Sequence, residues 1–371
     1  MNIFITDNPL EMEEIGREIV KEKENIYQPL MIETIYNAIS SNLRGASEQQ
    51  KNSVFYRSIY DYWVYGNSID EEFYYDFLSK THKEKSEYIT FRLREKYCGY
   101  LNQGGDRDLF VDKYRTYQRF KKYYLRDVIQ IKSDEDYPVF EAFVKKHPSF
   151  VVKPKDMAFG VGVYLVKEND YSDLKELFEH IRDSGRKNHK EVVWAKNDYI
   201  VLEEIIEQDE RFAVFHPESV NGIRLTTIKK GDKVEIFYPW FKVGANHNFV
   251  TSAVFGTMDA GIDSKTGEVV TAGFKENGES YEYHPNTGVR IVGFKIPKWD
   301  ELVEIGTNLA LSLEKINYVG WDFVLTPKGW CIMEANYDGD FMGQLFHCKG
   351  QKKELEELIG WKFKKDFWWQ D

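Results

Sequence analysis

Two acidic residues and an amide, Asp322, Glu334 and Asn336, are spaced so that one metal ion could contact all three. They lie in residues 320–336, where two apolar, β-rich runs flank a Pro-Lys-Gly turn signal and predict a β-hairpin. If the hairpin folds about Lys328, Asp322 lies opposite Glu334, and Asn336 points to the same face. Two facing carboxylates repel unless a cation lies between them. Carboxylate and amide oxygens suit Mg²⁺, so we predict a magnesium site, the alternative being a surface hairpin with solvated acids.

Residues 149–166 look like two strands joined by a loop that contains Gly160 and Gly162. Lys153 ends the first strand, where its ammonium group can reach a phosphate. The glycines permit a close approach of backbone N–H groups to phosphate oxygens. Two glycines are common in hairpin loops, and this loop matches neither the P-loop nor the dinucleotide-binding pattern. The prediction of a phosphate-binding loop therefore depends on the lysine before it and on the acidic hairpin far behind it.

Residues 199–210 begin as an apolar strand and end in acids. Such a strand can present backbone N–H and C=O groups to the edge of an adenine, and a later carboxylate to the ribose hydroxyls. Arg224 follows inside another apolar strand, where an isolated guanidinium requires an anion. Together with the glycine loop, these features predict a nucleotide-binding site.

The elements that must position these residues fall into three regions. Residues 1–100 look helical, residues 101–210 hold the glycine loop and the strand that ends in acids, and residues 211–371 hold the acidic hairpin and a tail with three Trp. From about residue 137 short strands alternate with helices, which predicts an α+β (α/β) fold. The expected elements are helices at 112–124, 172–184 and 300–316, a strand at 200–206, and an antiparallel pair of 222–229 with 233–243.

Aromatic residues are dense between residues 53 and 77 and again in the tail. The first group is a sugar or lipid docking surface or, as we expect, the core of a helical region. The tail either packs on the protein's own core, which we expect, or forms an exposed interaction segment.

Composition bounds the partners and the compartment. A net charge of −11 over 371 residues argues against nucleic acid as a partner. Three scattered cysteines indicate reduced thiols and a cytoplasmic location rather than a zinc site. No apolar run is long enough for a transmembrane segment, and the first residues lack the features of a secretory signal. The oligomeric state stays open.

The order of these features resembles the ATP-grasp superfamily. It runs from a lysine on a helix through a lysine on a strand, a glycine loop, an apolar strand with acids and an arginine strand to the Asp…Glu-x-Asn hairpin. The sequence is most similar to the sugar-transfer associated branch, through the marks at 221–224, 284–288 and 293–297. The resemblance covers about residues 100–350. It implies an ATP-grasp fold, in which two α+β subdomains clasp ATP, preceded by a mostly helical region.

The resemblance also implies a role for each matching residue. The residues implied to contact ATP are Lys113, Lys153, Gly160, Gly162, Glu203, Glu204, Ile206 and Glu210. The two lysines contact phosphates, and the glycines belong to a closing loop. Glu203, Glu204 and Ile206 line the adenine, and Glu210 binds the ribose, with Asp209 as the alternative. Mg²⁺ is held by Asp322, Glu334 and Asn336. Arg224 stabilises the transferred phosphoryl group or an acyl phosphate and is, with Lys153, the implied catalytic residue.

The function that the resemblance implies is that of an ADP-forming carboxylate–amine ligase. It would use ATP and Mg²⁺, pass through an acyl phosphate, and join a small-molecule carboxylate to an amine or sugar acceptor in surface-polysaccharide biosynthesis. Three alternatives stay open: a phosphotransferase acting on a hydroxyl, a nucleotide-binding protein without turnover, and a glycosyltransferase-like or structural protein. Residues 252–256 are less glycine-rich than the family pattern, which leaves the acceptor pocket undefined.

Overall fold

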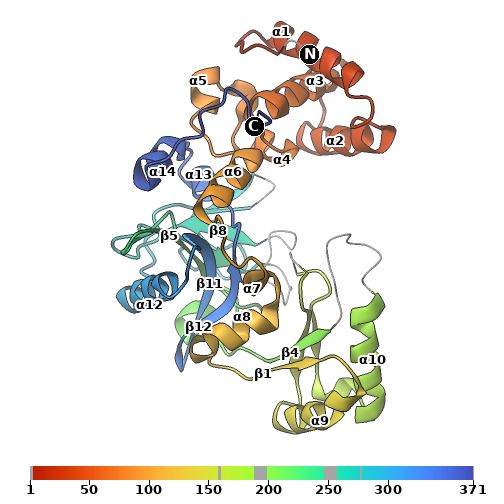
Figure 1. Cartoon of the computed structure of the whole chain (residues 1–371), viewed down its shortest axis with the longest axis vertical. Helices are drawn as coiled ribbons and strands as arrows, with labels where there is room; N and C mark the ends of the chain where they lie inside the picture. The colour runs from red at the N-terminus through yellow and green to blue at the C-terminus, as the bar shows by residue number, and fades with distance from the viewer. Residues whose placement is uncertain (1–2, 158–159, 188–198, 246–256, 276–277, 371) are drawn as a thin grey trace. The chain divides into compact units, whose positions relative to one another are not determined.

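The computed structural model of the protein describes residues 3–157, 160–187, 199–245, 257–275 and 278–370. The chain divides into two compact units (Figure 1). The helical unit comprises Met1–Leu101 together with Asp340–Asp371, and the sheet unit comprises Asn102–Gly339. All the residues predicted to contact ATP or Mg²⁺ belong to the sheet unit.

The helical unit agrees with the expectation of helices over residues 9–100. Its elements are α1 (Pro9–Glu22), α2 (Pro29–Asn42), α3 (Glu48–Tyr65), α4 (Ile69–Tyr74), η1 (Phe77–Ser79), α5 (His82–Lys85), α6 (Phe91–Leu101), α13 (Gly343–Phe346) and α14 (Lys352–Ile359). Phe55, Tyr60, Trp63 and Phe77 are buried together in the core of this unit. A helical core, rather than a docking surface, therefore explains the aromatic residues between 53 and 77.

The tail packs within the helical unit, although its place in the sequence suggests the region of the acidic hairpin. The indole N–H groups of Trp368 and Trp369 donate to the carbonyl oxygens of Tyr62 and Trp63, at 2.6 and 2.9 Å. These carbonyls belong to the last turn of α3, and that of Tyr62 also accepts from the N–H of Gly66. The paired residues are 306 positions apart in the sequence, so no local pattern indicates the contact.

A four-stranded antiparallel sheet forms the first part of the sheet unit, in the order β1-β4-β2-β3. Its strands are β1 (Val128–Ile131), β2 (Phe150–Pro154), β3 (Tyr164–Val166) and β4 (Ile200–Glu204). Helices α9 (Tyr137–Lys146) and α10 (Leu174–Lys187) lie beside it (Figure 1). Phe140 of α9, Phe150 of β2 and Phe178 of α10 are buried in one cluster, which fixes the helices against the sheet.

An eight-stranded sheet forms the second part, in the order β10-β9-β8-β7-β5-β11-β12 with β6 paired to β5. Its strands are β5 (Gly222–Lys230), β6 (Lys233–Ile236), β7 (Trp240–Val243), β8 (Met258–Gly261), β9 (Gly273–Phe274), β10 (Ser280–Tyr281), β11 (Tyr318–Thr326) and β12 (Gly329–Asn336). Besides α9 and α10, the sheet unit contains the helical elements α7 (Asp108–Val111), α8 (Lys113–Phe120), η2 (Lys121–Tyr123), η3 (Asp134–Asp136), η4 (Glu168–Asp170), α11 (Glu210–Ala213) and α12 (Trp299–Leu311). The mixed helix and sheet content confirms the α+β fold class.

The single strand expected over residues 233–243 is wrong, because the structure divides it into β6 and β7. Tyr238 between them has a left-handed φ of 44°, and Pro239 follows with no N–H to donate to a ladder. β6 therefore pairs with the end of β5, while β7 pairs with its beginning, beside Arg224.

The acidic hairpin is formed by β11 and β12, and Asp322 lies opposite Glu334 as predicted. The turn is tighter than a fold about Lys328 requires, because Thr326 already pairs with Gly329. The register then shifts between Asp322 and Phe323, so that one residue of β12 is skipped. Without this β-bulge, Glu334 would point to the face opposite Asp322.

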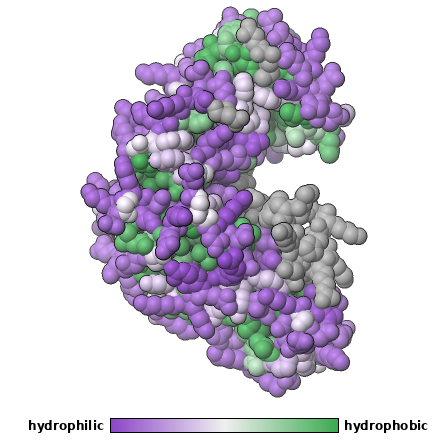
Figure 2. Space-filling model, in the orientation of Figure 1, coloured by the Kyte–Doolittle hydropathy of each residue, from purple (hydrophilic) through white to green (hydrophobic). Residues whose placement is uncertain are grey.

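The surface in Figure 2 is mainly hydrophilic, with apolar residues in small separate areas. Large apolar side chains with high exposure are scattered, for example Leu10, Leu30 and Val214. Among the described helices, none combines the length and the apolar character that crossing a lipid bilayer requires.

Candidate functional site

Asp322 lies at the centre of a charged group on one face of the eight-stranded sheet. Arg224 on the neighbouring strand β5 donates to it as a fork, Nε to Oδ1 at 2.8 Å and Nη2 to Oδ2 at 3.1 Å. Lys242 Nζ lies 3.6 Å from Oδ1, and Asn336 Nδ2 lies 3.3 Å from Oδ2. Burial alone would raise the pKa of Asp322, but Arg224 and Lys242 outweigh it and lower the pKa.

Arg224 fits beside Asp322 because two glycines leave room for its side chain. A Cβ atom added at Gly320 would lie 2.9 Å from Nη1 of Arg224, and one added at Gly339 would lie 3.1 Å from the same atom. The guanidinium also lies over the ring of Trp240, 5.3 Å from its centroid. The anion that the sequence requires for Arg224 is therefore Asp322, a residue 98 positions away.

Lys113 joins this group from the start of α8. Its Nζ lies 3.6 Å from Oε1 of Glu334 and donates to the carbonyl oxygen of Met157 at 2.5 Å. Its backbone N–H donates to the carbonyl oxygen of Lys155, so the start of α8 is tied to the segment that follows β2. The carboxylate of Glu334 is 43% exposed and thus open to a further ligand.

Lys153 and Glu203 form a second charged pair, on the four-stranded sheet. Lys153 Nζ donates to Oε2 of Glu203 at 2.8 Å, and the buried Arg126 donates to the same oxygen. Burial would raise the pKa of Glu203, but Arg126 and Lys153 outweigh it and lower the pKa from 4.5 to about 2. Lys153 is thus held by a carboxylate that stays ionised.

Three further predicted ATP contacts lie in loops, and a fourth begins α11. Gly160 and Gly162 both adopt left-handed backbone, with φ of 75° and 73°, and residues 158–159 of the same loop lie outside the described residues. Ile206 follows β4 and is half-buried, while Glu210 is exposed at the first position of α11. Asp209 caps α11 and pairs with Arg211, and the assignment of Glu210 to the ribose stays a prediction.

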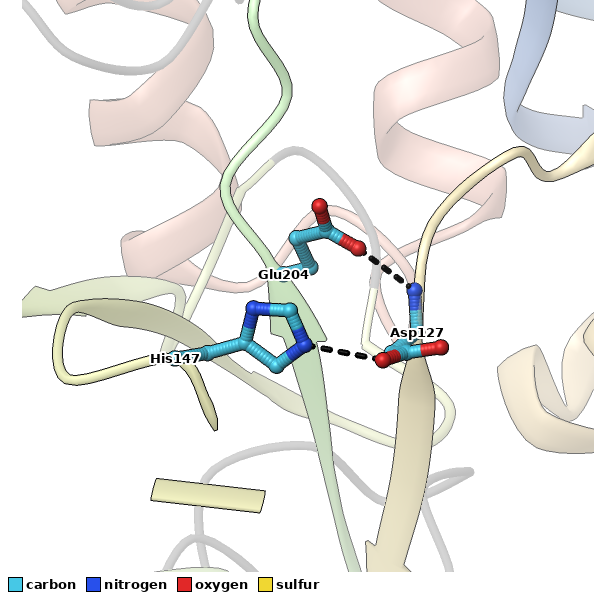
Figure 3. Close-up of side chains that lie close together, drawn as sticks. All are labelled: Asp127, His147 and Glu204. Carbon is cyan, nitrogen blue, oxygen red and sulfur yellow. Dashed lines mark hydrogen bonds and ion pairs between the residues drawn. The ribbon is translucent and has the colours of Figure 1, made fainter. Parts of the chain in front are cut away.

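Glu204 lies close to Asp127 and His147, and the three form a second group of possible metal ligands (Figure 3). Ligand atoms of Asp127, His147 and Glu204 lie within 4.8 Å of one another. Asp127 Oδ2 already accepts from Lys146 at 2.5 Å and shares a hydrogen bond with His147 at 2.8 Å, and Lys328 lies 3.8 Å from Glu204. Lys146 and His147 lower the pKa of Asp127. The group therefore offers three possible ligands, and both of its acids already lie beside cations of the protein itself.

Two cations in the site have no counterpart in the sequence prediction. Arg126 and Lys242 contact Glu203 and Asp322 across strands or between sheets, so their partners are distant in sequence. The sequence offered one signal for Arg126, its place just before an apolar strand, where an arginine requires an anion if the strand is buried. The hairpin brings two carboxylates on paired strands to one face, and carboxylate oxygens suit Mg²⁺. In this structure Arg224 is paired with Asp322, and Asn336 directs its Nδ2 rather than its oxygen at Asp322.

The mark at residues 284–288 has a structural role. His284 is buried, its Nε2 lies 2.8 Å from the carbonyl oxygen of Gly244, and its Nδ1 accepts from the backbone N–H groups of Asn286 and Thr287 at 3.3 Å. It therefore fastens a turn to the end of β7. Residues 252–256, whose low glycine content left the acceptor pocket undefined in the sequence, lie outside the described residues.

A sequence profile described as sugar-transfer associated ATP-grasp matches residues 92–358. The chain belongs to this family. Among solved structures, D-alanine–D-alanine ligase from Helicobacter pylori is 17% identical with a TM-score of 0.41, over 68% of this chain and 61% of that one. An L-amino acid ligase from Bacillus licheniformis is 14% identical with a TM-score of 0.40, over 72% and 52%. The chain thus spans less than two thirds of both structures, and no curated protein matched its sequence.

Proposed function

We propose that this protein is an ATP- and Mg²⁺-dependent ligase that joins a carboxylate to an amine through an acyl phosphate. The observation that carries the proposal is the convergence of Asp322, Glu334 and Asn336 on one face, beside Arg224 and Lys113. Membership of the ATP-grasp family supports the use of ATP. We further propose that the substrate is a sugar or an amino acid in surface-polysaccharide biosynthesis, and the family description supports the link to sugar transfer.

The charges of the site suit transfer of the terminal phosphoryl group of ATP. Mg²⁺, held by the three hairpin residues, would neutralise phosphate charge and act as a Lewis acid. Lys113 and Lys153 would bind phosphate oxygens, and Arg224, preoriented by Asp322, would face the charge that develops during transfer. The protein's part is to position and stabilise charge, so no nucleophilic side chain is required.

The proposed reaction has two steps. A carboxylate oxygen of the substrate attacks the γ-phosphorus, and the bond to the β-phosphate oxygen breaks to release ADP. The nitrogen of the amine then attacks the carbon of the acyl phosphate, phosphate leaves, and the amine loses a proton. We place the protein in the cytoplasm, where ATP is available and thiols stay reduced. In support, its three cysteines, all among the described residues, form no disulfide.

The test is ADP release from ATP and Mg²⁺ in the presence of pooled amino acids, uronic acids and amino sugars, with product masses measured. We expect ADP and phosphate, a requirement for a carboxylate, and a hydroxamate when hydroxylamine is added. Glu334→Gln should lose this activity, whereas Glu235→Gln, an exposed acid on β6, should keep it. AMP as product would refute the acyl phosphate. A stable phosphate ester on the acceptor would establish a phosphotransferase instead.

A further inference from the structure

Arg126 lies just before β1 and is buried, with only 7% of its surface exposed. Its Nε and Nη2 donate to Oε2 of Glu203 at 3.0 and 2.8 Å. Its Nη1 donates to the carbonyl oxygen of Ile332 at 2.5 Å, and its Nη2 lies 3.4 Å from the carbonyl oxygen of Met333. The guanidinium lies 4.5 Å from the ring centroid of Tyr124. One side chain therefore joins β4 of the four-stranded sheet to β12 of the eight-stranded sheet.

On the β4 side, the contact determines the position of a lysine. Glu203 has one oxygen, Oε2, that accepts from both Arg126 and Lys153. A carboxylate held by a two-pronged donor has little rotational freedom, so the ammonium group that it binds is also fixed in place. The position of Lys153 thus depends on Arg126 through Glu203.

On the β12 side, the contact falls on the β-bulge. The ladder pairs Phe323 with Ile332 and Asp322 with Glu334, so Met333 is the residue that it skips. A bulge disrupts the ladder locally, and its carbonyl groups need other donors when they are buried. Arg126 supplies donors to the carbonyl oxygens of Ile332 and Met333, which belong to the two peptide groups on either side of Met333. Since the bulge turns Glu334 to the face of Asp322, Arg126 supports the position of Glu334.

We infer that Arg126 is a positioning residue that couples the phosphate-binding Lys153 to the metal-binding Glu334. This inference rests on the proposed function, which gives Lys153 and Glu334 those roles. Arg126 contacts neither of them directly and acts through Glu203 on one side and through the bulge on the other. Its effect is to hold the two halves of the site at a fixed separation, which a single transferring phosphoryl group requires.

Arginine suits this task better than lysine for a geometric reason. The guanidinium is planar and offers five N–H donors in a fixed fork, so that it can bind Glu203 along one edge and the carbonyl of Ile332 at another corner. A lysine ammonium is a compact charge at the end of a flexible stem. In Arg126→Lys it can still neutralise Glu203, but it cannot also hold the bulge. Arg126→Met removes both contacts and keeps an unbranched side chain of similar shape.

The test uses the full-length protein and three variants, Arg126→Lys, Arg126→Met and the control Arg119→Lys, an exposed arginine on α8. Affinity for ATP is measured with EDTA, and the Mg²⁺ concentration for half-maximal ATP turnover is measured separately. We expect Arg126→Lys to bind ATP within about threefold of wild type but to need about ten- to a hundredfold more Mg²⁺, the usual loss when the support of a metal ligand is removed. Arg126→Met should bind ATP more weakly and need more Mg²⁺, whereas the control should change in neither property.

Hydrogen exchange of residues 329–336 without nucleotide gives a readout that does not depend on activity. We expect faster exchange around Met333 in both Arg126 variants, and unchanged exchange in the control. The coupling is refuted if Arg126→Lys folds and weakens ATP binding as much as it raises the Mg²⁺ requirement, or if it changes neither. If the wild-type protein shows no ATP turnover at all and the hairpin still exchanges faster in the two Arg126 variants than in wild type, the placement of Glu334 by Arg126 is supported and the proposed function is refuted.

Discussion

We predict that Glu203→Gln destabilises the protein by about 3 kcal/mol at pH 7. The pKa of Glu203 falls from 4.5 to about 2 on folding. A pKa difference of this size corresponds to about 3 kcal/mol of extra stability when the group is ionised. The estimate agrees with the 3–5 kcal/mol, roughly, that is lost when one partner of a buried ion pair is removed. In this variant Arg126 and Lys153 would stay close together with no countercharge.

The pH dependence gives an independent check on the same residue. Because the folded pKa of Glu203 lies below the unfolded value, its stabilisation is complete above about pH 4.5 and is lost as the pH falls towards 2. The assay is urea unfolding, which adds no ionic screening, at pH 7 and at steps down to pH 3. Glu203→Gln should show a smaller loss of stability with acid than wild type, while Glu207→Gln, an exposed acid nearby, should match wild type. A loss below about 1 kcal/mol at pH 7 would refute the assigned pairing.

Three further outcomes are expected. Glu334→Gln should reduce ATP turnover by about a hundredfold, the scale of losing one preorganised charge, and unchanged kinetics would exclude it as a metal ligand. Lys153→Met should raise the KM for ATP about tenfold or more, as measured by steady-state kinetics, and calorimetry showing unaltered ATP affinity would contradict a phosphate contact. Gly320→Ala should displace Arg224 and lower kcat about a hundredfold, while Gly99→Ala, with nothing within 4 Å of the added Cβ, should behave as wild type. Equal kcat values for these two glycine variants would show that Arg224 is not constrained as described.

Local sequence patterns were sufficient for most of the elements. The helices of the N-terminal region, α10 at Leu174–Lys187 and the strand β4 at Ile200–Glu204 lie close to their predicted places. Periodicity and turn residues determine such elements within a few residues of chain. The break between β6 and β7 was missed although Pro239, which cannot donate to a ladder, is a sequence signal for it. The left-handed backbone of Tyr238 beside it is not encoded by the residue type.

The pairing of the tail with α3 was not predictable for a different reason. In each of the two hydrogen bonds, the tail indole and the α3 carbonyl are 306 residues apart. The composition of a Trp-rich segment does not say which surface will bury it. Apolar area is favoured to leave water wherever a complementary surface exists, so the choice of surface is made only when the helices have assembled.

The sequence alone determined which side chains could form the site, because residue type fixes the chemistry and alternation along a strand fixes the face. It predicted Asp322, Glu334 and Asn336 together, and the pairing of the first two is confirmed. Only the tertiary structure decided how that pairing arises. With a two-residue turn and an unbroken ladder, Glu334 would point to the face opposite Asp322. The bulge, supported by Arg126, brings Glu334 back to the face of Asp322. Such a contact joins residues 206 positions apart, and no local pattern encodes it, because its free energy is gained only when both sheets have formed.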